Sequence, residues 1–413
     1  MSNGRPILIL AASTGAGHLI AARAVEAALR SLAPALRVEV HDVLASAGPF
    51  FRRFYGGGYA GMVRRFPTAM GWLYDQMDHL ARPGHDRVRR SIQGLFTGAI
   101  ARHIVGRQPK LIINTHFLSA EIAAQLRRRG RLSCPQVTVT TDFETHRLWV
   151  HTPTERYYTA TELGRAYLAM WGVPPERVLV TGIPVRLAFE QPTERAAARA
   201  ALGLQMDRPA VLLLGGVLGL ETTHELLTEL LRMPADAQIV VVAGRNERLR
   251  RRLEEQAAAA PRRVYVIGFT EQMHEYMRAA DLVITKPGGL TSSEALVSGL
   301  PLVIVNPIPG QETRNSDYLL EHGAAIKVNN PRLLGHRVSE ILSQPARLEA
   351  LRDAALRLAK PGAAATIARD ALELLRNWPG CVRATDDGHS YSAPTTCVSG
   401  SPAVEPGCPD PRS

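Results

Sequence analysis

The stretch from Leu282 to Asn315 reads LVITKPGGLTSSEALVSGLPLVIVNPIPGQETRN, and its pattern decides the fold. A short apolar run, a glycine turn, a helix-like segment, a second apolar run and a polar loop follow one another. Neither apolar run alternates with polar residues, which is typical of parallel strands buried on both faces of a sheet. The stretch therefore predicts a strand–helix–strand unit of an α/β domain.

The same pattern recurs along the rest of the chain. The other apolar runs are PILILAAS, VEVHDV, LIINTH, QVTVTTDF, RYYTATE and VLVTGIP in the first half, and AVLLLGG, IVVVAG, VYVIGF and AAIKV in the second. Amphipathic segments such as HLIAARAVEAALRSL separate them. Two such series predict an α/β protein of two doubly wound, Rossmann-like domains, with ligands near the carboxyl ends of the strands.

The domain boundary is expected where a strand ends in Ile183-Pro184 and a polar helical segment follows. The first domain then covers residues 1–185, with an insertion over about 44–107, and the second covers 186–362. A helix over 363–378 is expected to cross back to the first domain. Residues 380–413 are rich in Pro, Ser and Gly, so they are expected to be disordered, and no role is assigned to them.

The composition fits a cytosolic globular protein. Of its 413 residues 46% are apolar and 21% charged, and no stretch approaches the roughly 20 uninterrupted apolar residues of a membrane span. The amino terminus lacks the apolar core of a signal peptide. The four cysteines, Cys134, Cys381, Cys397 and Cys408, have no metal-ligand spacing and suit a reducing compartment.

The net charge of +11 is concentrated in the insertion. Residues 51–107 hold ten arginines and three aspartates, interleaved with Phe, Tyr, Trp and Met. Such a segment can lie in an anionic membrane interface, with arginines on the phosphates and rings at headgroup depth. Basic and aromatic residues also suit nucleic acid, and an ordinary helical cap over the sheet is the plainest alternative. We favour membrane contact.

The glycine turn of the opening stretch predicts a phosphate site. Gly288 and Gly289, followed by Thr291 and Ser292, place free backbone N–H groups and hydroxyls at a helix N-terminus, which attracts a diphosphate. Glu294, one turn further on, can accept hydrogen bonds from two ribose hydroxyls, although a glutamate there is also a capping residue.

Two further segments of the second domain are expected to face the same pocket. Gln311, Glu312 and Asn315 offer carboxylate and amide groups that suit sugar hydroxyls. Gly215 and Gly216, after the first strand of this domain, allow the backbone to approach a phosphate.

A second glycine loop, STGAGH, follows the first apolar run of the chain. Gly15 and Gly17 fit a dinucleotide fingerprint, and Asp42 ends the next strand, but Ile20 stands where the third glycine belongs. His18 is expected at the carboxyl edge of the first strand, facing the cleft. Its imidazole is either a base for an incoming hydroxyl or an ordinary helix-start residue that bonds a turn.

Taken together, STGAGH, TDFETHRLWVH, VTGIPV, TKPGGLTSSEAL and PGQETRN resemble the family of monogalactosyldiacylglycerol synthases and processive diacylglycerol glucosyltransferases. The chain is more distantly similar to the lipid-linked N-acetylglucosaminyltransferase of peptidoglycan synthesis. The resemblance runs from about Ile7 to Leu375. It implies a GT-B fold, an inverting reaction without a metal or other cofactor, a UDP-sugar on the second domain and a membrane lipid acceptor on the first.

The resemblance also implies roles for individual residues. His18 becomes the catalytic base. Gly288, Gly289, Thr291 and Ser292 lie near the diphosphate, Glu294 binds the ribose, Gln311 and Glu312 bind the donor sugar, Phe269 and Met273 border the uracil, and Asp142, His146 and Trp149 lie on the acceptor side. The residues themselves, apart from the resemblance, add Gly215, Gly216 and Asn315 to the donor side and Gly15 and Gly17 to the acceptor side. Two motifs depart from the family forms, because GAGH replaces GGGH and TKPGG replaces K-x-GPG.

The expected function is therefore transfer of a hexose from a UDP-sugar to a lipid such as diacylglycerol, by a protein held at the inner face of a membrane. The leaving diphosphate would be stabilised by the helix N-terminus and by Lys286, with no metal. The alternatives are a GT-B transferase with a soluble or isoprenoid-linked acceptor, a UDP-N-acetylglucosamine epimerase of the same architecture, and an NAD-binding protein. A nucleic-acid partner is not expected, because it leaves Glu294 and GQETRN unexplained.

Overall fold

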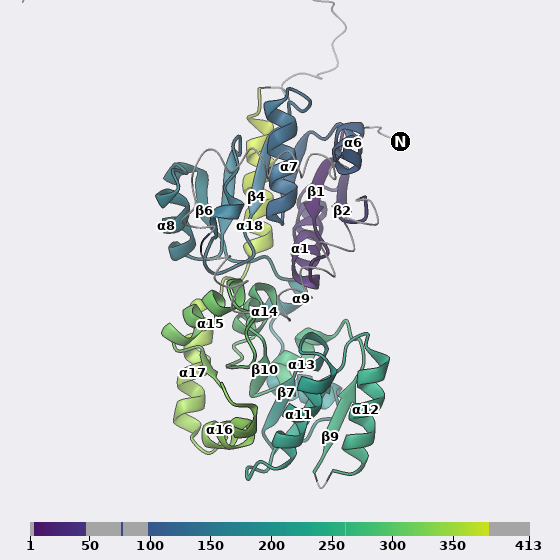
Figure 1. Cartoon of the computed structure of the whole chain (residues 1–413), viewed down its shortest axis with the longest axis vertical. Coiled ribbons are helices and arrows are strands. Elements are labelled where there is room, and N and C mark those ends of the chain that lie inside the picture. The colour runs from purple at the N-terminus through teal and green to yellow at the C-terminus, as the bar shows by residue number, and fades with distance from the viewer. Residues whose placement is uncertain (1–3, 47–75, 77–97, 261, 380–413) are drawn as a thin grey trace, which may run out of the picture.

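The computed structural model describes residues 4–46, 76, 98–260 and 262–379. Most of the insertion and the whole tail, on which the predictions of membrane contact and disorder fall, lie outside these residues. Figure 1 shows two α/β domains stacked along the long axis of the molecule. The prediction of two doubly wound domains is confirmed.

The first domain is built on a parallel sheet with strand order β2-β1-β3-β4-β5-β6. Its strands are β1 (Ile7–Ala11), β2 (Val38–Asp42), β3 (Leu111–Asn114), β4 (Gln136–Val139), β5 (Arg156–Thr159) and β6 (Val178–Val180), and its helices are α1 (Ala16–Leu32), α6 (Gly98–Arg107), α7 (Phe117–Arg128) and α8 (Glu162–Met170). All residues of β1, β3 and β4 are buried, as expected for strands covered on both faces.

The second domain has a parallel sheet with strand order β12-β11-β10-β7-β8-β9. Its strands are β7 (Ala210–Leu213), β8 (Gln238–Val242), β9 (Val264–Ile267), β10 (Leu282–Thr285), β11 (Leu302–Ile304) and β12 (Ala325–Lys327), and its helices are α10 (Arg195–Ala201), α11 (Leu220–Leu231), α12 (Glu247–Ala258), α13 (Met273–Ala279), α14 (Gly289–Val297), α15 (Gln311–Glu321), α16 (Leu334–Leu342) and α17 (Pro345–Leu358). The stretch from Leu282 thus forms β10, α14 and β11.

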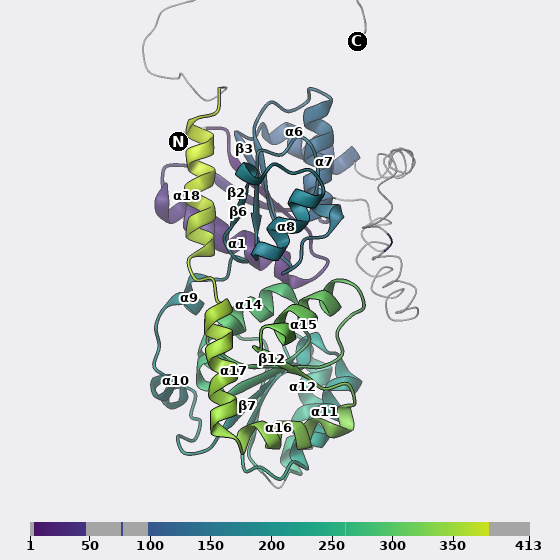
Figure 2. The same cartoon turned by 90° about the vertical axis from the view of Figure 1, so that its left-hand side faces the viewer.

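The chain passes between the domains twice, and the two crossings lie side by side. The first runs from β6 to the short helix α9 (Leu187–Glu190), and the second links α17 to α18 (Ala363–Arg376). A Cβ atom on Gly182 would overlap the side chain of Lys360, and the Gly362 N–H donates to Glu190 Oε1 at 2.9 Å. Helix α18 then packs against α1 of the first domain, as Figure 2 shows.

Two local expectations differ from the structure. The segment GQETRN is not a loop, because helix α15 begins at Gln311. Gly310, with φ of 96°, turns the chain sharply, and Glu312 accepts a hydrogen bond from the Ile308 N–H. The last strand of the first domain ends at Val180 instead of Ile183-Pro184, since Gly182 has a positive φ of 88° that breaks the extended chain.

Candidate active site

The first domain has one point where its strand order reverses, between β1 and β3. In open α/β sheets the crevice at such a point binds ligands, because the loops that follow the two strands lead away in opposite directions. His18 lies in the first turn of α1, just after β1, and His116 caps the start of α7, just after β3. Their rings contact each other edge to face, with centroids 4.6 Å apart.

The tautomer of His18 follows from its neighbours. Its Nδ1 lies 2.9 Å from the carbonyl oxygen of Thr115 and 2.9 Å from Thr141 Oγ1. A carbonyl oxygen only accepts hydrogen bonds, so Nδ1 carries the proton and Nε2 carries the lone pair. Burial lowers the pKa of His18 to about 4, although the bond to Thr115 opposes the shift. The ring is therefore neutral at pH 7, and its Nε2 can accept a proton.

His116 has the opposite arrangement. Its Nδ1 accepts a hydrogen bond from the Leu118 N–H at 3.0 Å, so the proton of the neutral ring is on Nε2, which lies 3.3 Å from Thr14 Oγ1. Burial and the neighbouring His18 hold the pKa of His116 well below its usual value. His18 and His116 are thus two neutral imidazoles with different tautomers.

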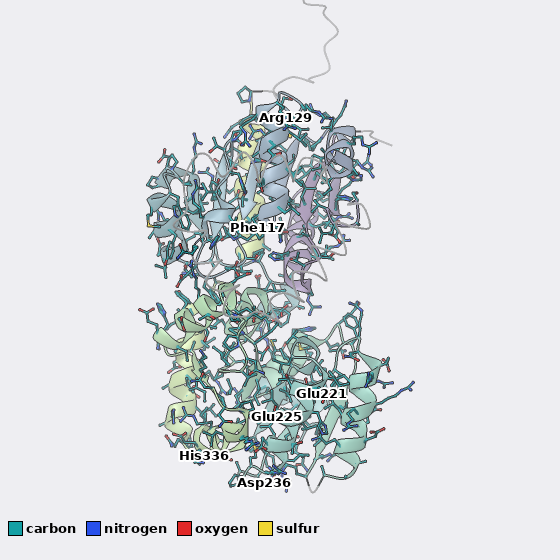
Figure 3. All side chains as sticks on the ribbon, viewed as in Figure 1. Phe117, Arg129, Glu221, Glu225, Asp236 and His336 are labelled. Carbon is teal, nitrogen blue, oxygen red and sulfur yellow. The ribbon has the colours of Figure 1, made fainter. Side chains whose placement is uncertain are left out.

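A small pocket between the domains brings predicted acceptor-side and donor-side residues together. It is lined by His18, Phe117, Asp142, His146, Leu148, Trp149 and Gln311. Gln311 comes from α15 of the second domain and the others come from the first. In Figure 3, Phe117 marks the end of α7 that faces the second domain, whereas Arg129 lies at the far end of the molecule. The lining combines aromatic side chains, such as Phe117 and Trp149, with polar ones, such as Asp142 and Gln311.

Asp142 belongs to the turn after β4, at the base of this pocket. The side-chain amides of Gln311 and Asn315 donate to its Oδ1. Burial raises the pKa of Asp142 to about 6, although these amides and the Trp149 side chain lower it in part. The Asp142 carboxyl group therefore connects the two domains.

The strand order of the second domain reverses between β7 and β10, and the predicted phosphate residues follow these two strands. Gly288 is the N-cap residue of α14, and a Cβ atom on it would meet no atom within 4 Å. Gly289 is crowded, because a Cβ atom there would overlap the carbonyl oxygen of Thr141 in the first domain. Gly289 therefore has a packing reason to be glycine, in addition to any phosphate contact.

The hydroxyl residues of α14 differ in their surroundings. Ser292 is fully buried, and its Oγ has no hydrogen-bond partner within the part of the chain that the structure describes. Thr291 is only partly buried.

Glu294 lies on α14 with 6% of its surface exposed. Burial raises the pKa of its carboxyl group to about 7, and the Arg186 charge lowers it only slightly. Among the described residues no side chain or backbone N–H donates to this carboxylate. The Glu294 carboxyl oxygens are not among the fully buried polar atoms that lack a partner, so they are open to a ligand that donates hydrogen bonds, such as a ribose with two hydroxyls.

Most of the polar side chains predicted to face the sugar from helix α15 already bond to other groups of the protein. Lys286 Nζ forms an ion pair with Glu312 Oε1 at 2.8 Å, so the cation expected to meet the diphosphate is already partly neutralised. Asn315 Nδ2 donates to the Pro287 carbonyl oxygen at 3.2 Å and to Asp142 at 3.4 Å, and its Oδ1 accepts from the Phe143 N–H at 3.0 Å. Any contact of Asn315 with a sugar is therefore restricted to Oδ1.

The remaining donor-side residues lie on loops at the carboxyl edge of the second sheet. Gly215 and Gly216 follow β7, and a Cβ atom on Gly216 would come within 2.9 Å of the Ala243 carbonyl oxygen. Phe269 follows β9, is 53% exposed and stacks on Arg245, whose guanidinium carbon is 3.8 Å from the ring centroid. Met273 begins α13.

The glycines of the first loop also have structural roles. Gly15 is the N-cap residue of α1. A Cβ atom on Gly17 would lie 3.4 Å from the Cβ of Leu290 in the second domain. The small residues before His18 therefore let α1 approach α14.

Sequence reasoning missed several residues of the pocket region. Thr115, His116 and Phe117 directly follow β3, and Thr141 directly precedes Asp142. Because β3 is the strand beside β1 at the reversal of strand order, applying the crevice rule to the run LIINTH would have selected Thr115, His116 and Phe117, but not Thr141, which follows β4. Within the described part of the chain, no group of three or more His, Cys, Asp or Glu side chains has the arrangement of a metal site. No helix in that part is long and apolar enough to cross a bilayer.

Comparisons with known proteins agree with this arrangement. A family model described as monogalactosyldiacylglycerol (MGDG) synthase matches residues 18–185, and one described as glycosyl transferases group 1 matches residues 194–357. The chain is 30% identical over 367 residues to a processive diacylglycerol beta-glucosyltransferase of Bacillus licheniformis, covering 85% of this chain and 90% of that protein.

Solved structures share the fold at low identity. Acinetobacter baumannii MurG has a TM-score of 0.56 at 17% identity, covering 90% of this chain and all of that one. A UDP-GlcNAc 2-epimerase from Neisseria meningitidis, bound to UDP-GlcNAc, has a TM-score of 0.55 at 12% identity, covering 89% of this chain and all of that one. These likenesses concern the fold alone, and they do not separate a transferase from an epimerase.

Two doubly wound domains that meet at a pocket, with α18 returning to the first domain, define a GT-B glycosyltransferase fold. Within that class, the chain belongs to the family of monogalactosyldiacylglycerol synthases and processive diacylglycerol beta-glucosyltransferases.

Proposed function

We propose that this protein transfers a hexose from a UDP-sugar to the hydroxyl of diacylglycerol, with inversion at the anomeric carbon. The observation that carries the proposal is the pocket between the domains, in which His18 and the predicted acceptor-side residues meet Gln311 of the second domain. The relative from Bacillus licheniformis, a processive diacylglycerol beta-glucosyltransferase, supports the same substrate class.

In the proposed reaction the acceptor oxygen attacks C1 of the sugar on the face opposite to UDP. The new C1–O bond forms as the bond from C1 to the diphosphate oxygen breaks, and UDP leaves with the electron pair. His18 Nε2 takes the hydroxyl proton, because its lone pair is fixed by the bonds at Nδ1. The N-terminus of α14 stabilises the charge that develops on the diphosphate, and Lys286, paired with Glu312, contributes less than a free cation would.

The donor side of the proposal depends on Glu294. Its buried carboxylate would accept hydrogen bonds from the two ribose hydroxyls of UDP, while Gln311 would bind the sugar and Phe269 and Met273 would border the uracil. The proposal includes no metal or other cofactor.

We also propose that the protein works at the inner face of a membrane, held there by the basic and aromatic segment 51–107. The ten arginines against three aspartates in that segment support attraction to anionic lipid. Co-sedimentation with vesicles of anionic and of neutral lipids tests this part: binding that does not depend on anionic lipid would contradict it.

The test of the reaction is to incubate the full-length protein with a panel of UDP-sugars and diacylglycerol vesicles and to identify products by mass. A hexosyl diacylglycerol together with released UDP is the expected result. Conversion of UDP-N-acetylglucosamine without any acceptor would support the epimerase alternative instead. Transfer only to a water-soluble or isoprenoid-linked acceptor would keep the GT-B chemistry but contradict the diacylglycerol assignment.

A further inference from the structure

The turn Thr141–Phe143, after β4, contacts the catalytic histidine on one side and the second domain on the other. On the first side, Thr141 Oγ1 lies 2.9 Å from His18 Nδ1. On the second side, the Phe143 N–H donates to Asn315 Oδ1 at 3.0 Å, and Asp142 accepts from Gln311 and Asn315. Three successive residues thus join the predicted base to helix α15.

The second domain contacts the backbone and the side chains of this turn at several points, in addition to the bond from Thr161 of the first domain to the Phe143 carbonyl oxygen. Asn315 is 1% exposed and also donates to the Pro287 carbonyl oxygen, which lies in the glycine turn before α14. The Phe143 ring stacks on Tyr318 of α15 with centroids 5.1 Å apart, and the Thr141 carbonyl oxygen packs directly on Gly289. The turn is therefore held by both helices that carry the predicted donor-binding residues.

The contacts with His18 are of two kinds. Thr115 directly follows β3, and its N–H donates to the Leu10 carbonyl oxygen at 2.9 Å, so its place is set within the first domain. Thr141 lies in a turn that contacts both domains, because Phe143 bonds Thr161 of the first domain and Asn315 of the second. The Nδ1–H of His18 is shared by these two acceptors, so the orientation of the ring depends on whether the second domain is seated on the turn.

We propose that Thr141 is a positioning residue for His18, and that Asn315 sets the position of Thr141 through the Thr141–Phe143 turn. The seated second domain thereby aligns the lone pair of Nε2 with the pocket, and a separated domain leaves it less ordered. This inference rests on the proposed transfer reaction and adds to it a coupling between the donor domain and the base.

The first test compares Thr141→Val with Thr141→Ser. Valine keeps the shape and removes the hydroxyl, whereas serine keeps the hydroxyl. We expect Thr141→Val to lower kcat about tenfold, the equivalent of one ordinary hydrogen bond, with UDP affinity unchanged and Thr141→Ser close to the parent protein. Equal loss in both variants would show a packing role, and normal turnover in Thr141→Val would overturn the proposal.

The second test measures coupling between the two sides of the turn. Asn315→Ala alone should lower kcat, and combining it with Thr141→Val should cost less than the product of the two separate losses, because both act on the same contact. Losses that simply multiply would mean that Asn315 does not act through Thr141. Should Asn315→Ala fail to fold, the Thr141 pair still decides the positioning role.

A measurement without turnover separates this proposal from the proposed function. The ¹⁵N NMR spectrum of the histidine-labelled protein should show His18 with the proton on Nδ1, held there by the Thr115 carbonyl oxygen. Thr141→Val should change the Nδ1 chemical shift, because it removes one of the two acceptors of this N–H, while Thr141→Ser should not. Identical His18 signals in all three proteins would overturn the positioning role. Absence of sugar transfer by the parent protein, with the expected NMR change, would instead contradict the proposed function.

Discussion

The two crevices of the molecule, one in each domain, are built differently. At β1 and β3 the first domain places two neutral imidazoles whose ring nitrogens are largely engaged by protein groups, as at His18 Nδ1 and His116 Nδ1. At β7 and β10 the second domain places a glycine turn and the buried carboxylate of Glu294, to which no described residue donates. The first crevice has its orienting contacts already formed, and the second retains a carboxyl group that is open to a ligand. The difference fits a fixed base on one side and a bound nucleotide on the other.

The largest expected effect is on turnover, from a change in the crevice of the first domain, whose orienting contacts are already formed. His18→Ala should reduce kcat for sugar transfer by ~10²–10⁴, since loss of a general base typically has that cost. UDP affinity should remain near that of the parent protein, because Glu294 and the α14 turn lie in the other domain. Turnover assays and calorimetric UDP binding measure the two quantities, and normal turnover in His18→Ala would exclude the assignment of the base.

A smaller effect is expected on UDP binding, from a change in the crevice of the second domain. Glu294→Ala should weaken UDP binding by about 10–100-fold, the usual range for a lost hydrogen bond to a charged group, without a matching loss of unfolding temperature. Titration of UDP into both proteins measures the change. Unchanged affinity would mean that the ribose is held elsewhere.

Substitutions of two neighbouring glycines at the start of α14 test the contact between the two domains. Gly289→Ala should cost about 1–3 kcal/mol of stability or domain contact, because the new methyl group would overlap the Thr141 carbonyl oxygen. Gly288→Ala is the matched control, since a Cβ atom there meets nothing within 4 Å and its φ is −69°. Thermal unfolding of both variants is the measurement, and equal stability would contradict the close approach of the domains.

The smallest expected effect is the pH dependence of UDP binding. The pKa of Glu294 is raised to about 7 in the folded protein, and the ionised form accepts both ribose hydrogen bonds, so affinity should rise severalfold from pH 6 to pH 8. The same shift means that folding stability is lost as pH rises from the ordinary value of about 4.5 through 7. Glu294→Gln should remove both slopes, and slopes that persist in this variant would assign them to another group.

Much of this arrangement was predictable from local sequence. Uninterrupted apolar runs identified the buried parallel strands, and small or hydroxyl residues after them marked the crevices at Gly15, His18 and Gly288. The contacts across the domain boundary were not predictable, because Asn315 and Asp142 are 173 positions apart and no local pattern pairs them. The helix at Gln311 was also missed, since the Pro and Gly residues before it indicate a loop and only the positive φ of Gly310 shows the turn into α15.

The two neighbouring crossings of the chain have a mechanical consequence. Gly182 lies against Lys360, and the Gly362 N–H donates to Glu190. The two chain segments that link the domains are therefore held together at one place. Any movement of the second domain that opens the donor crevice would also withdraw it from the turn at Thr141, because α14 and α15 carry both the predicted donor-binding residues and the contacts with that turn. A proteolytic cut within residues 359–362 would break one of these two links without changing any residue that lines the pocket.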